Sequence, residues 1–476
     1  RDLLEELMTS GDAEARLRAV EALGRLKTKS SVPLIAALTK DADRWVALEA
    51  AEALQRIESG GGADALAEML SSGDAYVKTA ALNGLAATAG KRQFALIEPL
   101  FASESAMVRR AALGAAVKAD ADAARAHVLK TIEKGSPQDR MTALELLGAI
   151  GNKEDLPVLC RVLLSPEPGL PPAEGAASGL GRWDNEKDLE KPCAIEHATV
   201  RETTPIAALL AAARGDDWVV ASIAIESLGK VASEGIIPDL IAIYESRGSR
   251  LDGDRRLAAV EAIRSLSAKL NEERIAELGV PAFLARAHAD PDSRVSEAAA
   301  GAAAASARRV AIPLPARGRV SGDRGAYPWG EPSLPLGNRK ILVSTPRGEI
   351  EILLYGDDAP NGVRSIVTLA ERGFYKGLTF HRVVPGFVIQ GGCPRGDGWA
   401  DAGYYLRNEV NLFHYRRGTV GLADSGKDTA GSQFFIMHTD HPHLDGRYTV
   451  VGRVVRGMDV VDRIEEGDAF TVKAMK

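Results

Sequence analysis

The chain has 476 residues, which is too many for one hydrophobic core, so we expect two or more domains. Its 59 Lys and Arg residues nearly balance 65 Asp and Glu residues, and this balance does not favour nucleic-acid binding, which needs a clustered basic excess. No run of 18 apolar residues occurs, so the sequence predicts no membrane-spanning helix.

The first two thirds of the chain repeat a short unit. The units share an apolar anchor at Leu17, Val46, Val77, Val108, Met141, Val219, Leu257 and Val295. The first steps between anchors are 29, 31, 31 and 33 residues, and the units open on Asp or Ser, which favour a helix N-cap. Such a period, with two apolar-striped helices per unit, is typical of a solenoid. The pattern resembles bacterial HEAT repeats, so we expect an all-α HEAT-type solenoid over residues 1–309.

Two segments break this pattern. The step from Met141 to Val219 is too long for one repeat, and the Pro- and Gly-rich residues 165–203 predict an irregular insertion, either on a binding face or as a solvated loop. One Cys160–Cys193 disulfide could tie this segment down, although we favour three free thiols. Residues 310–338 carry repeated Pro and Gly without a helical stripe, so they predict an extended linker.

Residues 339–476 differ in character and hold 14 of the chain's 24 Phe, Tyr and Trp residues. Short runs rich in Val, Ile and Phe predict strands, beginning with a hairpin over residues 340–355 that turns near Pro346. Apolar spacing predicts helices over residues 359–375 and 458–466. Many short strands with two helices suggest a closed β-barrel with capping helices.

Three motifs in this region carry a resemblance to a known family. They are "FHRVVPGFVIQGG" (380–392), "GSQFFI" (431–436) and "LDGRYTVVGRVVRGMDVVDRI" (444–464). They closely resemble cyclophilin-type peptidyl-prolyl cis/trans isomerases of the compact bacterial form, over about residues 339–466. The resemblance implies an enzyme that rotates X–Pro bonds in proline-containing polypeptide clients, with the solenoid as a client- or partner-binding module. The alternative is a non-catalytic scaffold that binds proline peptides.

Proline isomerisation explains why an arginine would stand in such a strand. Rotation about the amide bond has a barrier of about 18–20 kcal/mol because resonance must be broken. The twisted prolyl nitrogen regains a lone pair, and a fixed donor beside it stabilises the transition state more than either planar ground state. A guanidinium suits this task because it stays charged. We therefore assign this role to Arg382, and we expect no cofactor and no metal.

The resemblance also implies the remaining site residues. Phe387 would form the floor of an apolar pocket for the proline ring, and Gln390 would hold a substrate carbonyl and position Arg382. The other expected substrate contacts are Val388, Ala423, Asp424, Gln433, Phe435, His443, Leu444 and Tyr448. The backbones of Ala423 and Asp424 are expected to bind the extended peptide. His443 stands where many eukaryotic members have tryptophan, so we expect weak binding of cyclosporin-class inhibitors.

Other reactive side chains in this region receive structural interpretations. Alternation turns His381 to the face opposite Arg382, so we expect it to pack in the core. His438, His441 and His443 have a spacing that could suit a metal, but no thiolate completes a set, and we favour no metal site. Ser432 lacks the strand–turn–helix context of a hydrolase nucleophile, and Cys393 is expected to be inert. In the repeats, Arg109 and Arg110 are assigned to a solvated helix face.

The sequence leaves the compartment and the role of the linker open. The chain starts at Arg1 rather than Met, so a removed signal peptide would be invisible. Charge balance fits the cytoplasm or the bacterial periplasm, and we favour the cell envelope. A further hypothesis places the linker across the pocket, where its prolines would inhibit the enzyme in cis.

Overall fold

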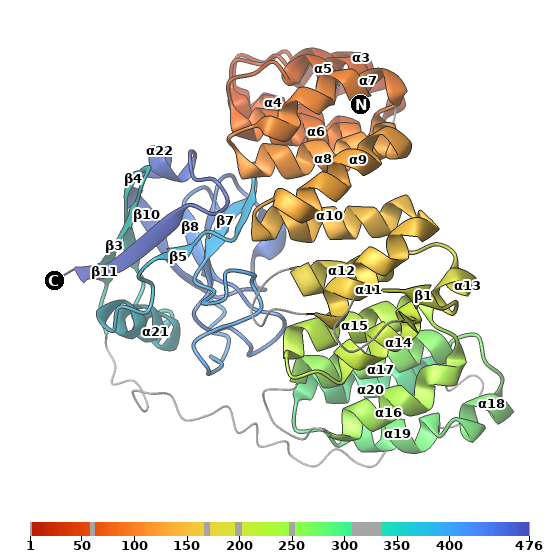
Figure 1. The fold of residues 1–476 in the computed structure, drawn as a ribbon. Coiled ribbons are helices and arrows are strands. Elements are labelled where there is room, and N and C mark those ends of the chain that lie inside the picture. Colours follow the sequence, from red (N-terminus) through yellow and green to blue (C-terminus); the bar gives the residue numbers. More distant parts are fainter. Residues whose placement is uncertain are drawn as a thin grey trace. The chain divides into compact units, whose positions relative to one another are not determined.

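The computed structural model describes residues 2–57, 62–165, 172–195, 202–246, 253–306 and 336–475. Two compact units divide the chain, one of residues 1–120 with 324–476 and one of residues 121–323 (Figure 1). The predicted linker over 310–338 lies outside the described residues except for residues 336–338, and so do its prolines. No helix in the described ranges has both the length and the apolar character needed to cross a membrane.

The N-terminal part of the first unit consists of paired helices. Their bounds are α1 (Asp2–Leu7), α2 (Ala13–Arg25), α3 (Val32–Leu38), α4 (Arg44–Ile57), α5 (Ala63–Met69), α6 (Ala75–Thr88), α7 (Lys91–Ile97) and α8 (Ala106–Ala119). The longer helices α2, α4, α6 and α8 pack on one another in sequence, as stacked repeats require. Asp74 caps α6, because its carboxylate accepts hydrogen bonds from the backbone N–H groups of Tyr76 and Val77.

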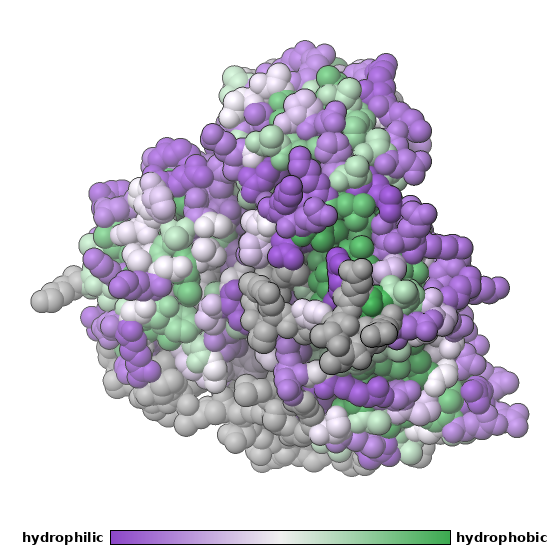
Figure 2. Space-filling view, in the orientation of Figure 1, coloured by the Kyte–Doolittle hydropathy of each residue, from purple (hydrophilic) through white to green (hydrophobic). Residues whose placement is uncertain are grey.

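The apolar anchors of this stack are mostly buried, with one informative exception. Leu17, Val46 and Val108 lie in the core, whereas Val77 is only half-buried and its neighbour Tyr76 is buried instead. Polar residues border the outer rim of these repeats on the face shown in Figure 2. The repeats therefore fold as the periodic pattern predicts, while Tyr76 is covered by a part of the chain that periodicity cannot reveal.

The second unit continues the helical repeats. Its helices are α9 (Ala121–Lys134), α10 (Pro137–Ile150), α11 (Leu156–Leu164), α12 (Pro172–Leu180), α13 (Glu186–Leu189), α14 (Pro205–Ala213), α15 (Trp218–Val231), α16 (Ile237–Ser246), α17 (Gly253–Ser267), α18 (Glu272–Glu277), α19 (Val280–His288) and α20 (Ser293–Ser306). A two-stranded pairing of β1 (Cys193–Ala194) with β2 (Glu202–Thr203) accompanies them. Helix α12 packs against α10, α11 and α15, so it belongs to the stack.

Helix α12 corrects the irregular insertion that was predicted over residues 165–203. Residues 172–180 are helical, and the glycines that suggested a loop serve close helix packing. A Cβ on Gly175 would lie 2.6 Å from the carbonyl oxygen of Met141, and a Cβ on Gly148 would collide with the backbone of Gly179. Glycine is therefore required where the backbones of α10 and α12 approach each other, which composition alone cannot distinguish from a turn.

The two cysteines near this helix lie side by side. The Sγ atoms of Cys160 on α11 and Cys193 on β1 are 3.6 Å apart, and both are free thiols, as is Cys393. Burial raises the pKa of the Cys160 thiol, with the neighbouring Cys193 as the next cause. The structure thus brings the two residues together as the sequence suggested, without a disulfide.

The C-terminal part of the first unit is a curled antiparallel sheet with two helices. The elements are β3 (Arg339–Thr345), β4 (Gly348–Leu354), α21 (Pro360–Glu371), β5 (Leu378–Thr379), β6 (Arg382–Val384), β7 (Val388–Gly391), β8 (Thr419–Leu422), β9 (Phe434–Met437), β10 (Val450–Arg456), α22 (Met458–Val461) and β11 (Ala469–Met475). The nine strands follow the order β5-β11-β3-β4-β10-β8-β9-β7-β6. Helix α21 contacts β11, and α22 contacts β4.

The sheet does not close, so the predicted closed barrel is wrong. Among the described strands, the edges β5 and β6 do not pair with each other. Only Phe380 and His381 separate these strands, and the backbone of Phe380 bonds to Asp468 and Gly467, which extends the pairing of β5 with β11. The chain therefore passes on into β6 instead of folding back as a hairpin, which leaves a half-barrel.

Candidate active site

The hairpin of β6 and β7 and the neighbouring strand β9 place three predicted site residues on one face. Arg382 lies directly opposite Gln390, and Gln390 lies directly opposite Phe435. Directly opposed residues in antiparallel strands project to the same side of a sheet. The hairpin turns at Pro385 and Gly386, and Gly386 has a φ of +76°, a conformation that favours glycine.

A chain of amide hydrogen bonds fixes the orientation of Arg382. The Nε2 group of Gln433 donates to the carbonyl oxygens of Gly398 (2.8 Å) and Ala400 (3.0 Å). Its Oε1 must then face the other way, where it accepts a hydrogen bond of 3.1 Å from Gln390 Nε2. Gln390 Oε1 is thereby turned to Arg382 Nη1, which donates to it over 3.3 Å. The backbone carbonyls of Gly398 and Ala400 therefore fix the orientation of both amides. As a result, Arg382 meets the oxygen of Gln390 and not its nitrogen.

Among the residues that the structure describes, the guanidinium of Arg382 has no ionic partner. Within the described ranges no carboxylate lies at ion-pair distance from it, and its Cζ lies 5.8 Å from the centroid of the Phe387 ring. Partial burial lowers the pKa of Arg382, but an arginine remains charged at any physiological pH. An uncompensated cation therefore stands beside an aromatic ring.

An apolar cluster of buried and partly exposed side chains lies next to this cation. Val388, Phe435 and Leu444 are buried in one cluster, and Phe387, Ala423 and Tyr448 pack against it while remaining partly exposed. The rings of Phe435 and Tyr448 meet edge to face with centroids 6.0 Å apart. The structure therefore brings the predicted apolar residues together with Arg382 and Gln390.

Tyr415 supports the pocket and was missed by the sequence analysis. Its buried ring stacks on Phe435 with centroids 5.6 Å apart. Gly421 on β8 leaves room for both rings, because a Cβ there would lie 2.6 Å from the Tyr415 hydroxyl. Tyr415 lies in a segment between strands, so neither periodicity nor a motif indicated it.

The predicted peptide-binding residues after β8 are partly committed to the fold. The backbone N–H of Ala423 donates to the carbonyl of Gln433 (3.0 Å), so this N–H is unavailable to a peptide. The Asp424 carboxylate accepts hydrogen bonds from Gly426 N–H (3.1 Å) and Asn408 Nδ2 (3.2 Å). Burial raises the pKa of Asp424. Asp424 therefore shapes the turn beside the pocket.

Two histidines form the rim next to Phe387. His443, in the short turn Pro442–Leu444, is exposed and nearly parallel to the Phe387 ring at 6.2 Å. His441 meets the same ring edge to face at 4.8 Å, and its Nε2 lies 3.1 Å from the carbonyl oxygen of Gly386. Burial lowers the pKa of His441. His441 was considered only as a metal ligand, whereas it supports the turn below Phe387.

The other reactive side chains are held by structural contacts. His438 is fully buried, and burial lowers its pKa to about 4. Ser432 Oγ donates to the carbonyl of Gly392 (2.8 Å), and the Cys393 thiol accepts from Gly398 N–H (3.3 Å). Burial also lowers the pKa of His381 to about 4. Across the described residues no group of three His, Cys, Asp or Glu side chains is placed to hold a metal ion.

Comparisons with known proteins place this arrangement in a family. A family model described as cyclophilin type peptidyl-prolyl cis-trans isomerase/CLD matches residues 340–476, and a HEAT-repeat model matches residues 1–86. A peptidyl-prolyl cis-trans isomerase of Helicobacter pylori is 47% identical over 130 residues, which are 26% of this chain and 80% of that protein. Peptidyl-prolyl cis-trans isomerase B of Bacillus subtilis is 48% identical over 124 residues, which are 26% of this chain and 87% of that protein.

The chain belongs to the cyclophilin-type peptidyl-prolyl cis-trans isomerases. A solved cyclophilin type isomerase of Cryptosporidium parvum has 26% sequence identity and a TM-score of 0.28, and it covers 29% of this chain and 98% of that protein. The family models and the bacterial relatives identify the protein as a peptidyl-prolyl cis-trans isomerase with HEAT repeats in its N-terminal region, as the motifs and the repeat pattern predicted.

The isomerase domain contacts the N-terminal repeats within the first unit. The Tyr76 hydroxyl on α6 donates to the carbonyl of Ile464, and Arg44 on α4 donates to the carbonyl of Asp462 (3.1 Å). Arg110 on α8 forms an ion pair of 2.7 Å with Glu466. Arg110 was predicted to lie on a solvated face, which is wrong because its side chain is only 13% exposed where it meets Glu466 of the isomerase domain.

Proposed function

We propose that Arg382 is the catalytic residue of this isomerase. As the X–Pro bond twists, the prolyl nitrogen loses its conjugation and presents a lone pair that a planar amide lacks. A guanidinium beside that nitrogen donates to it only in the twisted state, so the interaction lowers the barrier without stabilising the ground states equally. The observation that carries this proposal is the uncompensated Arg382 cation, oriented through Gln390 beside an apolar pocket.

The pocket residues complete the assignment. Phe387, Val388, Phe435 and Leu444 provide a surface for the pyrrolidine ring, which anchors the proline side of the bond while the other side rotates. Tyr448 and His443 would contact the peptide at the rim. Gln390 and Gln433 act as positioning residues for Arg382, and Gln390 also receives the substrate through its amide. At Ala423 the carbonyl is the backbone group that we propose for peptide binding, with the backbone of Asp424 beside it.

The same proposal covers the remaining parts of the chain. We assign residues 1–309 to a solenoid that binds client or partner proteins, residues 310–338 to a linker and residues 339–476 to the isomerase domain. Helices α21 and α22 would cap the half-barrel at β11 and β4, the strands that they contact. Proline-containing polypeptides are the proposed clients.

Replacement of Arg382 tests the catalytic assignment. We expect Arg382→Ala to lower kcat/KM on a proline-containing peptide by about 10²–10³-fold, which is the usual cost of removing one transition-state donor. Arg382→Lys keeps the charge but loses the planar fork, so its activity should lie between those of the unmodified protein and Arg382→Ala. Arg453→Ala is the matched control, because Arg453 is an exposed arginine on β10. Unchanged turnover in Arg382→Ala, with an intact fold by circular dichroism, would refute the role.

A further inference from the structure

A groove runs from the rim of the proline pocket along the N-terminal repeats, inside the first unit. It has a volume of about 310 Å³, and its isomerase side includes Phe387, His441 and His443. Its other side is formed by α2 and α4. A second hollow of about 560 Å³ shares Arg25, Glu52, Arg56 and Val384 with it and is also lined by Lys27. Phe387 therefore lines both the proline pocket and this groove.

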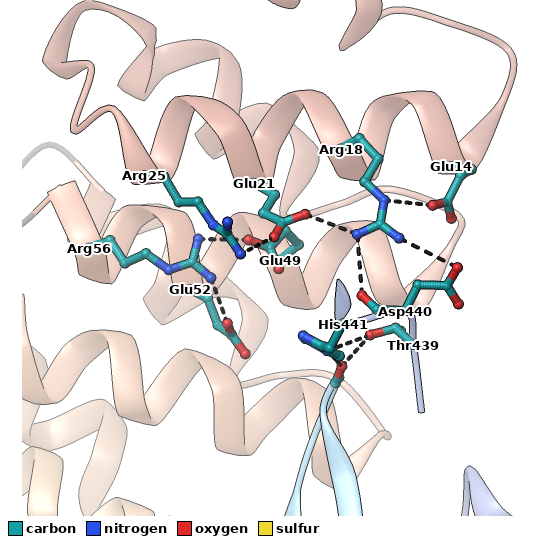
Figure 3. Close-up of polar contacts among 11 residues, drawn as sticks. Glu14, Arg18, Glu21, Arg25, Glu49, Glu52, Arg56, Thr439, Asp440 and His441 are labelled. Atoms are coloured by element: carbon teal, nitrogen blue, oxygen red, sulfur yellow. Dashed lines mark hydrogen bonds and ion pairs between the residues drawn. The ribbon is translucent and has the colours of Figure 1, made fainter. Parts of the chain in front are cut away.

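The groove is lined by more carboxylates than guanidinium groups, although its repeat side alone holds three of each. Arg56 is shared by two carboxylates, at 2.7 Å from Glu49 and 2.8 Å from Glu52 (Figure 3). Glu21 pairs with Arg18 (3.1 Å) and with Arg25 (2.6 Å). With Asp440, four carboxylates and three guanidinium groups line the groove. Arg18 is also bound by Glu14, which leaves less of its charge for the groove.

Most of these charges do not join the repeats to the isomerase domain, but Arg18 does, because its guanidinium donates to the carbonyl oxygen of Asp440 (3.4 Å) and lies 3.9 Å from its carboxylate. Across the described residues, Glu49, Glu52 and Arg56 form ion pairs only with one another. Further contacts between the two parts come from Arg44, Tyr76 and Arg110. Glu52 keeps 38% of its side chain exposed, so it is open to a ligand in the groove. Burial and the neighbouring Glu52 raise the pKa of Glu49 to about 7, although Arg56 lowers it.

We propose that this groove binds the client residues next to the proline and prefers a lysine or arginine side chain among them. The proposal rests on the proposed catalytic function, because the proline must occupy the pocket beside Phe387. An extended chain advances about 3.3 Å per residue, so only residues close to the proline reach the groove. A basic side chain there would join the carboxylates that now share Arg56. The first repeats would thereby choose among clients that the isomerase domain alone treats alike.

A peptide series on the full-length protein tests this preference. The peptides are identical except for one position flanking the proline, which is Lys, Ala or Glu, and kcat/KM is measured for each. We expect Lys to exceed Ala by about fivefold, the scale of one partly exposed ion pair, and Glu to be the poorest. A Lys-to-Ala ratio of one at every flanking position, or a preference for Glu, would overturn the proposal.

Variants identify the source of the ratio. Glu49→Gln with Glu52→Gln should bring the Lys-to-Ala ratio to about one, whereas Arg56→Gln should raise it by freeing both carboxylates. Glu261→Gln is the matched control, because Glu261 pairs with Arg264 on α17 in the second unit. If neither the double variant nor Arg56→Gln changes the Lys-to-Ala ratio, the proposal that this groove selects basic client residues is refuted.

The two proposals fail in different ways. Arg382→Ala should lower turnover of all three peptides by the same factor and so preserve the ratio. If Arg382→Ala has no effect, the catalytic assignment fails even when the ratio favours Lys. If turnover depends on Arg382 but the ratio is one, only the groove proposal fails.

Discussion

Replacing Gln390 by glutamate tests which property of Arg382 matters for catalysis, its orientation by the amide of Gln390 or its uncompensated positive charge. The new side chain has the same shape, so its oxygen stays about as far from Arg382 Nη1 as the present 3.3 Å. An ion pair at this distance is worth roughly 5 kcal/mol at an effective dielectric constant of ~20, but exposure of Arg382 reduces the net gain to about 1 kcal/mol. Arg382 would thus be held more firmly and carry less effective charge.

The same change also breaks the contact with Gln433. Gln390 Nε2 now donates to Gln433 Oε1 over 3.1 Å, and a carboxylate cannot donate. Gln433 cannot turn to compensate, since both hydrogens of its amide are bonded to backbone carbonyls. Losing this hydrogen bond costs about 1 kcal/mol. Together the two effects predict a loss of about 5- to 30-fold in kcat/KM for Gln390→Glu.

The assay compares Gln390→Glu with Gln390→Ala on one proline peptide. Gln390→Ala removes the aligning group without adding charge, so it should lose less, by about 3- to 10-fold. Both losses should fall mainly on kcat, because the interaction is made in the transition state. If Gln390→Glu matched or exceeded the unmodified protein, orientation alone would matter, and the cationic role of Arg382 would be wrong.

Two further predictions concern the N-terminal repeats. Tyr76→Phe leaves the carbonyl of Ile464 without its donor and should destabilise this contact by about 1–3 kcal/mol. Hydrogen exchange over residues 458–466 should therefore become faster. Unaltered exchange would show that the hydroxyl does not stabilise the contact. The Lys-to-Ala ratio should rise about twofold from pH 6 to pH 8, because the pKa of Glu49 is about 7 and its carboxyl is charged above that pH beside Glu52, Arg56 and Glu21. His441 and His443 face the same groove and would act in the same direction when protonated, so Glu49→Gln, which should flatten the profile, is the deciding comparison.

Local signals in the sequence were sufficient for much of the fold and for the grouping of three candidate site residues. The anchors repeat within about 30 residues, and Arg382, Phe387 and Gln390 belong to one hairpin, so their neighbourhood is encoded by short stretches. The errors have a different origin. Arg110 and Tyr76 looked like ordinary helix residues because their partners are in the other domain.

The two fold errors were failures of inference from composition and strand number. Glycines in α12 serve close packing with α10, yet the same composition suits a loop. Many short strands suggested a barrel, but closure depends on whether β5 and β6 pair, and the backbone bonds of Phe380 decide against it. Neither outcome is visible without three-dimensional neighbours.

The anchoring of Gln433 on main-chain oxygens has a consequence for how this catalyst tolerates change. Carbonyls are present whatever side chain a position carries, so drift at Trp399 or Ala400 should leave the arginine correctly aimed. Gly398 is the exception, because its φ of +88° disfavours other residues. Insertions or deletions in this loop would move the oxygens themselves, so length, far more than identity, is what evolution must preserve there.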